Sequence, residues 1–255
     1  GSKGRLICFD HDKDAWANAP KDNRVILVKE NFLYLKRFLK LHQFPKVDGI
    51  LADIGVSSFQ FDTGERGFSI RFDAPLDMRM DNRSSLTAAM IISKYSEAQL
   101  HQLFESYGEV RNAKTLAKTI VQGRNNRKIQ SIDDFKSLIA SCIKGNPNKY
   151  LAQVFQALRI EVNDELKNLE LFLKQTTDCL NEDGILAVIT FHSLEDRIVK
   201  HFMKQIDDEN VNDPFGTLKT KKNFKVLKDV LPSDAELKAN SRSRSARLRI
   251  AQRLK

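Results

Sequence analysis

The chain has 255 residues, 41% hydrophobic and 29% charged, a composition that is typical of a globular protein and excludes a disordered one. Its net charge of +9 favours anionic partners, and the sequence has neither an apolar run long enough to cross a bilayer nor the pattern of a signal peptide. Three cysteines, odd in number and far apart in the sequence, suggest neither a disulfide framework nor a zinc site and favour a reducing cytoplasm or matrix.

The first part of the chain alternates apolar runs with helical patterns. Residues 5–9, 24–28 and 48–53 are predicted strands, and apolar residues at helical spacing in 31–42 predict a helix before the third strand. Strands alternating with helices predict a parallel α/β sheet with both faces covered.

The middle of the chain changes character. Residues 54–84 have no periodicity and predict an ordered functional loop rather than a linker. Residues 86–145 carry only helical signals, among them capping boxes that begin at Ser96 and at Ser131. We therefore predict an all-helical domain inserted into the α/β domain.

The alternation resumes in the last part of the chain. Residues 155–173 predict one long amphipathic helix, 185–191 a buried strand, and Ser193 the cap of the next helix, with Asp196 completing its capping box. Apolar residues alternate with arginines in 246–250 and predict a strand with one buried and one basic face. The predicted domain boundaries are 1–84 and 149–255 for the two parts of the α/β domain and 85–148 for the helical insert.

Basic residues are concentrated at the end of the chain. Residues 240–255 contain six Arg or Lys residues and no acid. A face of this charge density attracts phosphates. A solvated tail explains the charge equally well.

Two predicted strands end in an acid, the first at Asp10 and the third at Asp53. Ligands of open α/β sheets bind outside the carboxyl ends of the strands, where an Asp commonly accepts a ribose hydroxyl. Each acid alone is equally consistent with a turn or cap residue, but the two in this order predict a nucleoside-containing cofactor. The glycine-rich turn of such a site is not found, because Gly1 and Gly4 follow no predicted strand.

Two further features allow a functional and a structural interpretation. Aromatic residues beside arginines suit stacking on an unpaired base, or they pack the loop onto the core. The phenylalanines concerned are Phe44, Phe59, Phe61, Phe68 and Phe72. His192 follows a predicted strand at the sheet edge of the two acids, and it either contacts a substrate or serves the local structure.

Seven motifs in order make the sequence highly specific. They are LADIGVSSFQFD, ERGFS, APLDMRMD, YGEVRNAKTLAKTIV, VFQALRIEVNDELKNLE, VITFHSLEDRIVK and NSRSRSARLRIAQR. With them the sequence resembles the bacterial MraW-type methyltransferases from about residue 5 to 253. That family transfers a methyl group from S-adenosylmethionine (SAM) to N4 of a cytidine in small-subunit ribosomal RNA.

The resemblance implies a class I Rossmann-like SAM-dependent methyltransferase domain with an inserted all-helical domain that helps to hold RNA. It places Asp10 at the ribose, Phe32 beside the adenine, and Asp53 and Gln60 at the cofactor. The family's glycine-rich loop is expected upstream of residue 1. The implied partner is 16S ribosomal RNA or the small subunit, in the cytoplasm, with no membrane and no metal, and a homodimer is left open.

Methyl transfer to a cytosine amine depends mainly on positioning, with acceptors that hold the N4–H groups. We expect Asp53, Asp77 and His192 to serve the reaction, and several arginines to bind RNA phosphates. The arginines are Arg71, Arg79, Arg242, Arg244, Arg247 and Arg249. The alternatives are a non-catalytic RNA-binding or ribosome-assembly protein without cofactor, and a dinucleotide-dependent oxidoreductase, which needs a G-x-G-x-x-G after its first strand.

Overall fold

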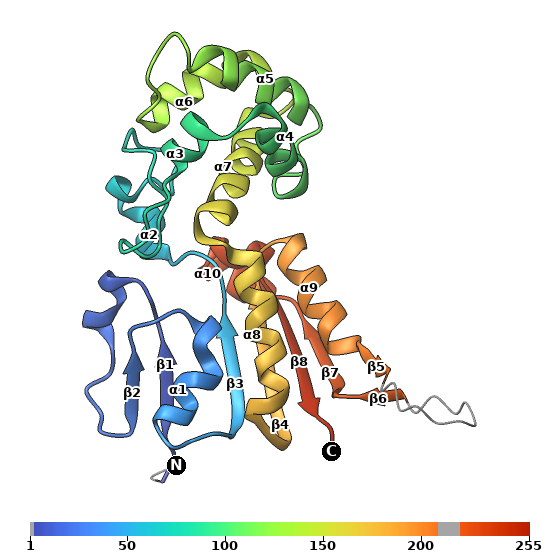
Figure 1. Cartoon of the computed structure of the whole chain (residues 1–255). Helices are drawn as coiled ribbons and strands as arrows, with labels where there is room; N and C mark the ends of the chain where they lie inside the picture. The colour runs from blue at the N-terminus through green and yellow to red at the C-terminus, as the bar shows by residue number, and fades with distance from the viewer. Residues whose placement is uncertain (1–2, 209–219) are drawn as a thin grey trace. The chain divides into compact units, whose positions relative to one another are not determined.

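The computed structural model describes residues 3–208 and 220–255. The chain forms two compact units, each built from segments that are not continuous in the sequence (Figure 1). We call Gly1–Asp10, Asn18–Gly55 and Leu166–Lys255 the sheet unit, and His11–Ala17 with Val56–Glu165 the helical unit. Each is described by itself.

The described strands of the sheet unit form three separate sheets, and the largest is mixed rather than parallel as predicted. One pair consists of β1 (Leu6–Phe9) and β2 (Val25–Val28), which are parallel. The larger sheet has the order β3 (Val47–Asp53), β4 (Leu180–Thr190), β8 (Arg247–Arg253) and β7 (Phe224–Val230). β3 and β4 are parallel, whereas β8 is antiparallel to both of its neighbours. The short strands β5 (Ile206–Asp208) and β6 (Thr220–Lys222) pair antiparallel.

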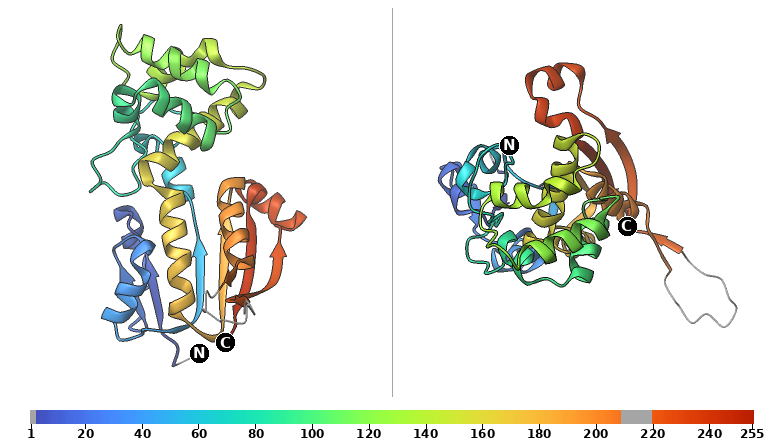
Figure 2. Two further views of the ribbon diagram at one scale, coloured as in Figure 1. Left: turned by 45° about the vertical axis from the view of Figure 1, so that its right-hand side comes forward. Right: turned by 90° about the horizontal axis from the view of Figure 1, so that it is seen from above.

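Helices lie along the strands of this unit (Figure 2). Apolar residues of these helices and of the strands share one core cluster. The helices of this unit are α1 (Leu35–Leu41), α8 (Glu165–Cys179), α9 (Ser193–Lys204) and α10 (Asp234–Ala239), with short 3₁₀ turns η2 (Phe32–Tyr34) and η5 (Ser241–Ser245). Leu39, Leu173 and Val199 of α1, α8 and α9 share one core cluster with Leu186 and Val188 of β4. The apolar residues that recur at helical spacing in the helices and those of the strands therefore pack into a single core.

The helical unit is built from six α-helices among the described residues. They are α2 (Ser58–Asp62), α3 (Ala88–Lys94), α4 (Glu97–Ser106), α5 (Ala113–Gly123), α6 (Ile132–Ile139) and α7 (Pro147–Asn163), with 3₁₀ turns η1 (Lys13–Asn18), η3 (Gly64–Arg66) and η4 (Ala140–Cys142). The capping boxes at Ser96 and Ser131 are confirmed, because each side chain accepts the N–H three residues later and the reciprocal bond is made. Phe104, Leu116 and Phe135 are fully buried.

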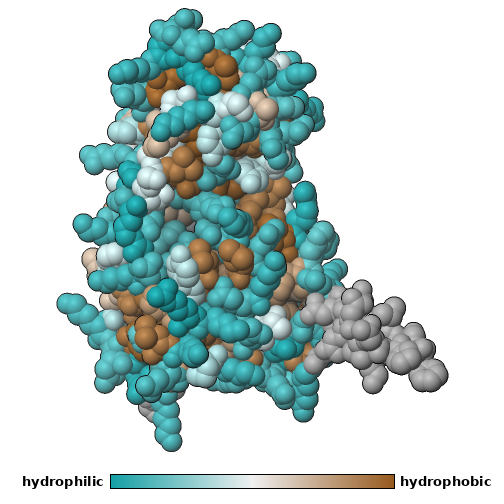
Figure 3. Space-filling model, viewed as in Figure 1, coloured by the Kyte–Doolittle hydropathy of each residue, from teal (hydrophilic) through white to brown (hydrophobic). Residues whose placement is uncertain are grey.

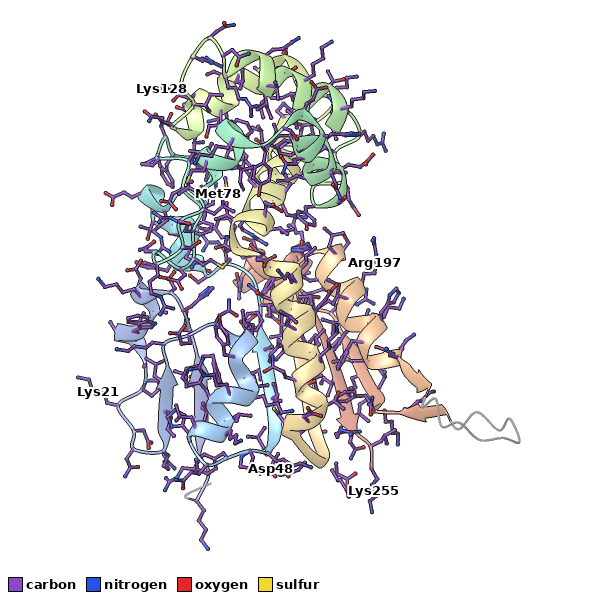
Figure 4. The ribbon with its side chains drawn as sticks, viewed as in Figure 1. Lys21, Asp48, Met78, Lys128, Arg197 and Lys255 are labelled. Carbon is purple, nitrogen blue, oxygen red and sulfur yellow. The ribbon has the colours of Figure 1, made fainter. Side chains whose placement is uncertain are left out.

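The helical unit is larger than the predicted insert, 85–148. Phe68, Leu76 and Met78 of the preceding loop belong to the same core cluster as the helices, and so does Val154 of α7. Met78, labelled in Figure 4, is 1% exposed. The loop and α7 therefore join the helical unit because they share its core, and neither the boundary at 84 nor that at 148 coincides with an edge of this unit.

Two predicted helical features are wrong. The single helix over 155–173 is two helices, because Asp164 adopts a left-handed conformation (φ 50°) that ends α7 before α8 begins. The cap of α9 is His192 rather than Ser193, and Glu195 rather than Asp196 completes its capping box. No helix among the described residues is long and apolar enough to span a membrane, and the face drawn in Figure 3 is mostly hydrophilic.

Candidate active site

The sheet unit places its two strand-end acids as the sequence predicts. Asp10 follows β1 and donates its N–H to the carbonyl of Val28 (3.1 Å), which extends the pairing with β2, and Asp53 ends β3. The arrowheads of β1, β2 and β3 point the same way in Figure 1. Partial withdrawal from water raises the pKa of the Asp53 carboxyl, although the residue remains exposed. Both acids thus stand at carboxyl ends of parallel strands, where α/β sheets bind ligands.

Phe32 begins η2 directly after the second strand. Asn31 caps this turn by accepting the N–H of Leu33 (2.9 Å), and the Phe32 ring meets that of Phe172 on α8 edge to face, with the centroids 5.2 Å apart. The ring is partly buried against the sheet core. Its position is therefore fixed by packing, with part of the residue still accessible.

The chain turns sharply after Asp53 at Gly55, whose φ is +101°. A Cβ at this position would lie 3.7 Å from the Phe191 ring and 3.9 Å from Oε1 of Glu195, so the turn passes close to the start of α9. Only glycine adopts this backbone conformation without strain. The turn therefore brings the Asp53 strand end next to the segment that carries His192.

His192 and Glu195 form a buried pair that the sequence interpretation missed. His192 Nδ1 accepts the N–H of Glu195 (3.4 Å), and the Glu195 carboxylate accepts the N–H groups of Phe191 (2.8 Å) and His192 (3.2 Å). The Glu195 side chain is 2% exposed, and its Oε1 lies 3.1 Å from His192 Nε2. Nδ1 is thus engaged as an acceptor, whereas the buried Nε2 has no hydrogen-bond partner within the described residues. The capping-box spacing of His and Glu in FHSLEDR was the available signal.

In the helical unit, Gln60 is held by a buried network. Its Oε1 accepts the N–H of Ser57 (3.0 Å), and its amide nitrogen donates to Asp12. Arg66 donates to Asp12 (3.1 Å), to Asp14 (2.5 Å) and to the carbonyls of the 79–80 segment. The amide of Gln60 is thus engaged within this unit. Asp12 and Arg66, which carry the network, were not predicted, and Asp12 lies in no motif.

Asp77 and Arg79 form a two-pronged ion pair, with Arg79 Nε and Nη2 at 2.8 and 2.7 Å from the two carboxylate oxygens. Burial alone would raise the pKa of Asp77, but the hydrogen bonds and charge of Arg79 lower it below its usual range. Arg79 also donates to the carbonyl of Ser84 (2.7 Å). Arg79 is therefore committed to its own loop rather than free for phosphates. Arg71 is exposed, and its guanidinium has no hydrogen bond or ion pair within the described residues.

The sequence predicts a basic face on the last strand, and this prediction is wrong for Arg249, which is buried. Arg249 is 5% exposed and binds Asp196 of α9 (2.6 and 3.0 Å) and Asp229 of β7 (3.2 Å). Arg247 also pairs with Asp229 (2.6 and 2.7 Å). Two acids distant in the sequence thus pair with two of the three arginines of this strand. Arg242 and Arg244 on η5 are exposed, so exposed positive charge of this segment lies on the turn before the strand.

The phenylalanines singled out in the sequence differ in their exposure. Phe68 is 6% exposed in the core of the helical unit, with the Arg66 guanidinium 5.8 Å from its ring centre. Phe59, Phe61 and Phe72 are 56%, 36% and 49% exposed. Phe44 is only partly buried in the sheet unit. Packing therefore explains Phe68, whereas three rings of the helical unit face water.

Comparison with known proteins agrees with the resemblance that the seven motifs carry. The model of the MraW methylase family matches residues 1–254. The chain belongs to this family. Similar relatives named ribosomal RNA small subunit methyltransferase H come from Flavobacterium psychrophilum (48% identity over 99% of this chain and 88% of the relative), Cytophaga hutchinsonii (50%; 98% and 85%) and Bacteroides thetaiotaomicron (47%; 99% and 84%).

For this MraW methylase, the structure distributes the predicted residues between the units. Asp10, Phe32, Asp53 and His192 belong to the sheet unit. Gln60, Asp77, Arg71 and Arg79 belong to the helical unit. Within the sheet unit, the Gly55 turn associates the Asp53 strand end with the His192–Glu195 segment. The family assignment made from the seven motifs is confirmed.

Proposed function

We propose that this MraW methylase transfers a methyl group from SAM to the exocyclic N4 of a cytidine in 16S ribosomal RNA of the small subunit. The observation that carries the proposal is the pair of acids at carboxyl ends of parallel strands, in a chain of a methylase family whose relatives are named for small-subunit ribosomal RNA. Since bacterial ribosomes are cytoplasmic, we place the reaction in the cytoplasm.

The strand arrangement supports a class I Rossmann-like domain with an inserted all-helical domain. β1 and β3 each pair on one side, and the other side of each has no partner among the described strands. Leu51 of β3 is 70% exposed, which is unusual for an apolar residue of a parallel strand. An additional parallel strand between β1 and β3 would pair both edges and would end at the acids. We assign the family's glycine-rich loop to the end of such a strand.

The residues present fit SAM in their chemistry. Asp10 offers carboxylate oxygens to ribose hydroxyls, and the partly accessible Phe32 ring offers an apolar surface to the adenine. SAM supplies an electrophilic methyl group, so the protein has mainly to bind and orient the two reactants. We assign Gln60 an indirect part, because its amide holds the loop to Asp12.

Asp53 is proposed to hold the amine during transfer. An ionised carboxylate accepts hydrogen bonds from the N4–H groups. It thereby helps to localise on N4 the lone pair that is otherwise delocalised into the ring, which makes the amine more nucleophilic. Its raised pKa also makes Asp53 a better proton acceptor than an ordinary Asp when N4 loses its proton. His192, whose Nε2 lies 3.1 Å from Oε1 of Glu195, is proposed to position the base. We assign Asp77 an indirect part, because both of its carboxylate oxygens already bind Arg79.

RNA phosphates are assigned to the exposed arginines Arg71, Arg242 and Arg244. Arg79, Arg247 and Arg249 are proposed to act by holding the structure, because their guanidinium groups already bind Asp77, Asp229 and Asp196. RNA affinity should therefore fall steeply with salt. An affinity that does not change with salt would contradict this part of the proposal.

Two measurements test the function. SAM is titrated into this chain and into a version extended upstream by a strand and a glycine-rich loop. Radioactive methyl transfer from SAM to small subunits and to free 16S RNA is then followed. We expect tight binding and N4-methylcytidine with the extended version. Asp53→Ala should abolish transfer, whereas Asp48→Ala on the same strand, an exposed position, should not. Absence of SAM binding in both versions would favour the non-catalytic RNA-binding alternative. Near-normal turnover by Asp53→Ala would show that Asp53 is not part of the catalytic site.

A further inference from the structure

The helical unit contains an open cavity of about 650 Å³, and of its lining residues only Asp77 has an assigned role, through its ion pair with Arg79. Its volume is in the range of small-ligand sites. The lining residues are Asp73, Ala74, Pro75, Leu76, Asp77, Thr87, Ala89, Gln130 and Ser131. All of them belong to the helical unit, so the cavity is complete within it.

Backbone hydrogen bonds fix the walls of this cavity. On one side Leu76 donates to the carbonyl of Gln130 (2.8 Å), and Ile132 donates to the carbonyl of Ala74 (2.9 Å). On the other side Ala89 donates to the carbonyl of Leu76 (2.8 Å). The 74–77 segment is therefore held between the start of α3 and the start of α6. A site framed in this way is formed before any ligand arrives, which lowers the cost of binding.

The polar groups of the lining offer both acceptors and donors. The Asp73 carboxylate accepts the N–H of Asp133 through one oxygen (3.0 Å) and has a second oxygen, and Asp77 is kept ionised by Arg79. The hydroxyl of Ser131 accepts a backbone N–H at its helix start, so its own proton remains to donate. The exposed side-chain amide of Gln130 makes no hydrogen bond within the described residues.

This set matches the edge of a nucleobase that carries an exocyclic amine. Carboxylate oxygens accept from an amine, and hydroxyl or amide groups donate to the ring nitrogen or carbonyl beside it. Ala74, Pro75, Leu76 and Ala89 supply an apolar surface for the base plane. Uracil has a carbonyl where cytosine has its amine. Its carbonyl oxygen would face the carboxylate oxygens without a hydrogen bond, so binding of uracil is disfavoured.

The residues before Asp73 suit the rest of a nucleotide. Phe72 is 49% exposed, and Arg71 has a free, exposed guanidinium within the described part of the chain. Phe72 lies against the backbone of Gly64, since a Cβ there would come within 3.2 Å of Phe72 Cβ. The two residues before Asp73 thus carry an exposed aromatic ring and a guanidinium that suits an RNA phosphate, outside the lining of the cavity.

We propose that this cavity binds an unpaired, amine-bearing nucleobase of the RNA substrate, separate from the cytidine that is methylated. The inference rests on the proposed action on RNA, because a flanking base reaches the cavity only when the strand is unpaired. Asp73 and Gln130 would select the base. The cavity would thus select the sequence context of the target.

The test uses protein-observed NMR on the full chain in an Asp53→Ala background, which removes binding through the proposed catalytic acid. CMP and UMP are titrated separately, and the shifts of the Gln130 side-chain amide and the Ser131 N–H are followed. We expect CMP to shift both signals and UMP to bind at least about tenfold more weakly. Asp73→Asn and Gln130→Ala should each weaken CMP about tenfold, because each removes a hydrogen bond to the base. The matched controls Glu105→Gln and Gln122→Ala, exposed elsewhere in the helical unit, should leave binding unchanged.

Equal shifts with UMP, or an unchanged CMP affinity in Asp73→Asn, would overturn the proposal. Methyl transfer to small subunits is measured in parallel in the wild-type background, where Asp73→Asn should raise KM for RNA about tenfold with little change in kcat. If the extended chain transfers no methyl group while CMP still shifts Gln130, the proposed function fails and the nucleotide site stands. If transfer is normal and CMP leaves Gln130 unshifted, the site fails and the function stands.

Discussion

The two units bury their residues to different degrees. Phe104, Leu116 and Phe135 of the helical unit are completely buried in a core that its loop and helices share. In the sheet unit, β1 and β3 each have a side without a partner among the described strands, and Leu51 of β3 is 70% exposed. The comparison indicates that the helical unit is self-sufficient in packing, whereas the sheet unit presents edges suited to a further strand.

A pair of large-to-small substitutions gives the largest contrast between the units. Phe135→Ala removes a fully buried ring that lies 5.8 Å from the ring of Phe155, and it should lower the free energy of unfolding by about 3–5 kcal/mol. Leu51→Ala should change it by less than about 0.5 kcal/mol in this chain, because most of the residue is already in water.

Urea denaturation checks this contrast. Trp16, the single tryptophan, lies in the helical unit, so its fluorescence follows that unit while circular dichroism follows the whole chain. A cost for Leu51→Ala close to that for Phe135→Ala would show that the edge of β3 is covered, and the comparison would fail. In a chain extended upstream, Leu51→Ala should become clearly destabilising.

The buried arginines provide a second contrast. Removing one partner of a buried ion pair leaves an uncompensated charge, so Arg66→Ala in the helical unit and Arg249→Ala in the sheet unit should each cost about 3 kcal/mol. The exposed Arg244→Ala should cost less than about 0.5 kcal/mol. It should instead reduce the slope of log affinity for RNA against log salt by about one.

Stability and RNA binding, each measured for all three variants, separate the structural arginines from those proposed to bind phosphates. If Arg66→Ala lowers the midpoint seen by Trp16 but Arg249→Ala leaves the circular dichroism transition unchanged, the pairing of β8 with Asp196 contributes nothing. A large loss of stability in Arg244→Ala would contradict the assignment of Arg244 as an exposed residue that serves RNA binding rather than the fold.

How far the sequence determines these features depends on the distance between the partners. The capping boxes at Ser96 and Ser131 were predictable because both bonded residues lie within one turn. The burial of Arg249 was not, because its partner Asp196 lies 53 residues away and brings α9 onto the strand. The alternation of arginines with apolar residues gave the correct strand but could not show which charges were already neutralised.

The site shows the same division. The strand-end positions of Asp10 and Asp53 followed from local patterns, because an apolar run and the acid after it are adjacent in the sequence. The network of Asp12, Gln60 and Arg66 joins residues that are 48 and 54 positions apart, and no local rule places Asp12 in it. The cap of α9 failed for a different reason, because His192 and Ser193 both offer an acceptor and only the backbone conformation decides between them.

The smallest expected effect is in the pH dependence of stability, where one acid of each unit should act with opposite sign. The pKa of Asp77 is lowered in the folded state by Arg79, so this acid stabilises the fold above its unfolded pKa of about 4 and loses that contribution as the pH falls through its folded value. The pKa of Asp53 is raised by partial burial, so its ionised form disfavours folding, and stability is recovered as the pH falls through the raised value.

Replacing each acid by Asn removes its titration. The difference in unfolding free energy between wild type and Asp77→Asn should therefore shrink as the pH is lowered from 6 to about 3. Asp53→Asn should be at least as stable as wild type at neutral pH, with the gain disappearing at acid pH. A destabilised Asp53→Asn at neutral pH would mean that the carboxylate has a stabilising partner in the fold. It would then be a structural strand-end residue, like the buried carboxylates of the helical unit, rather than an acid held ready for a substrate.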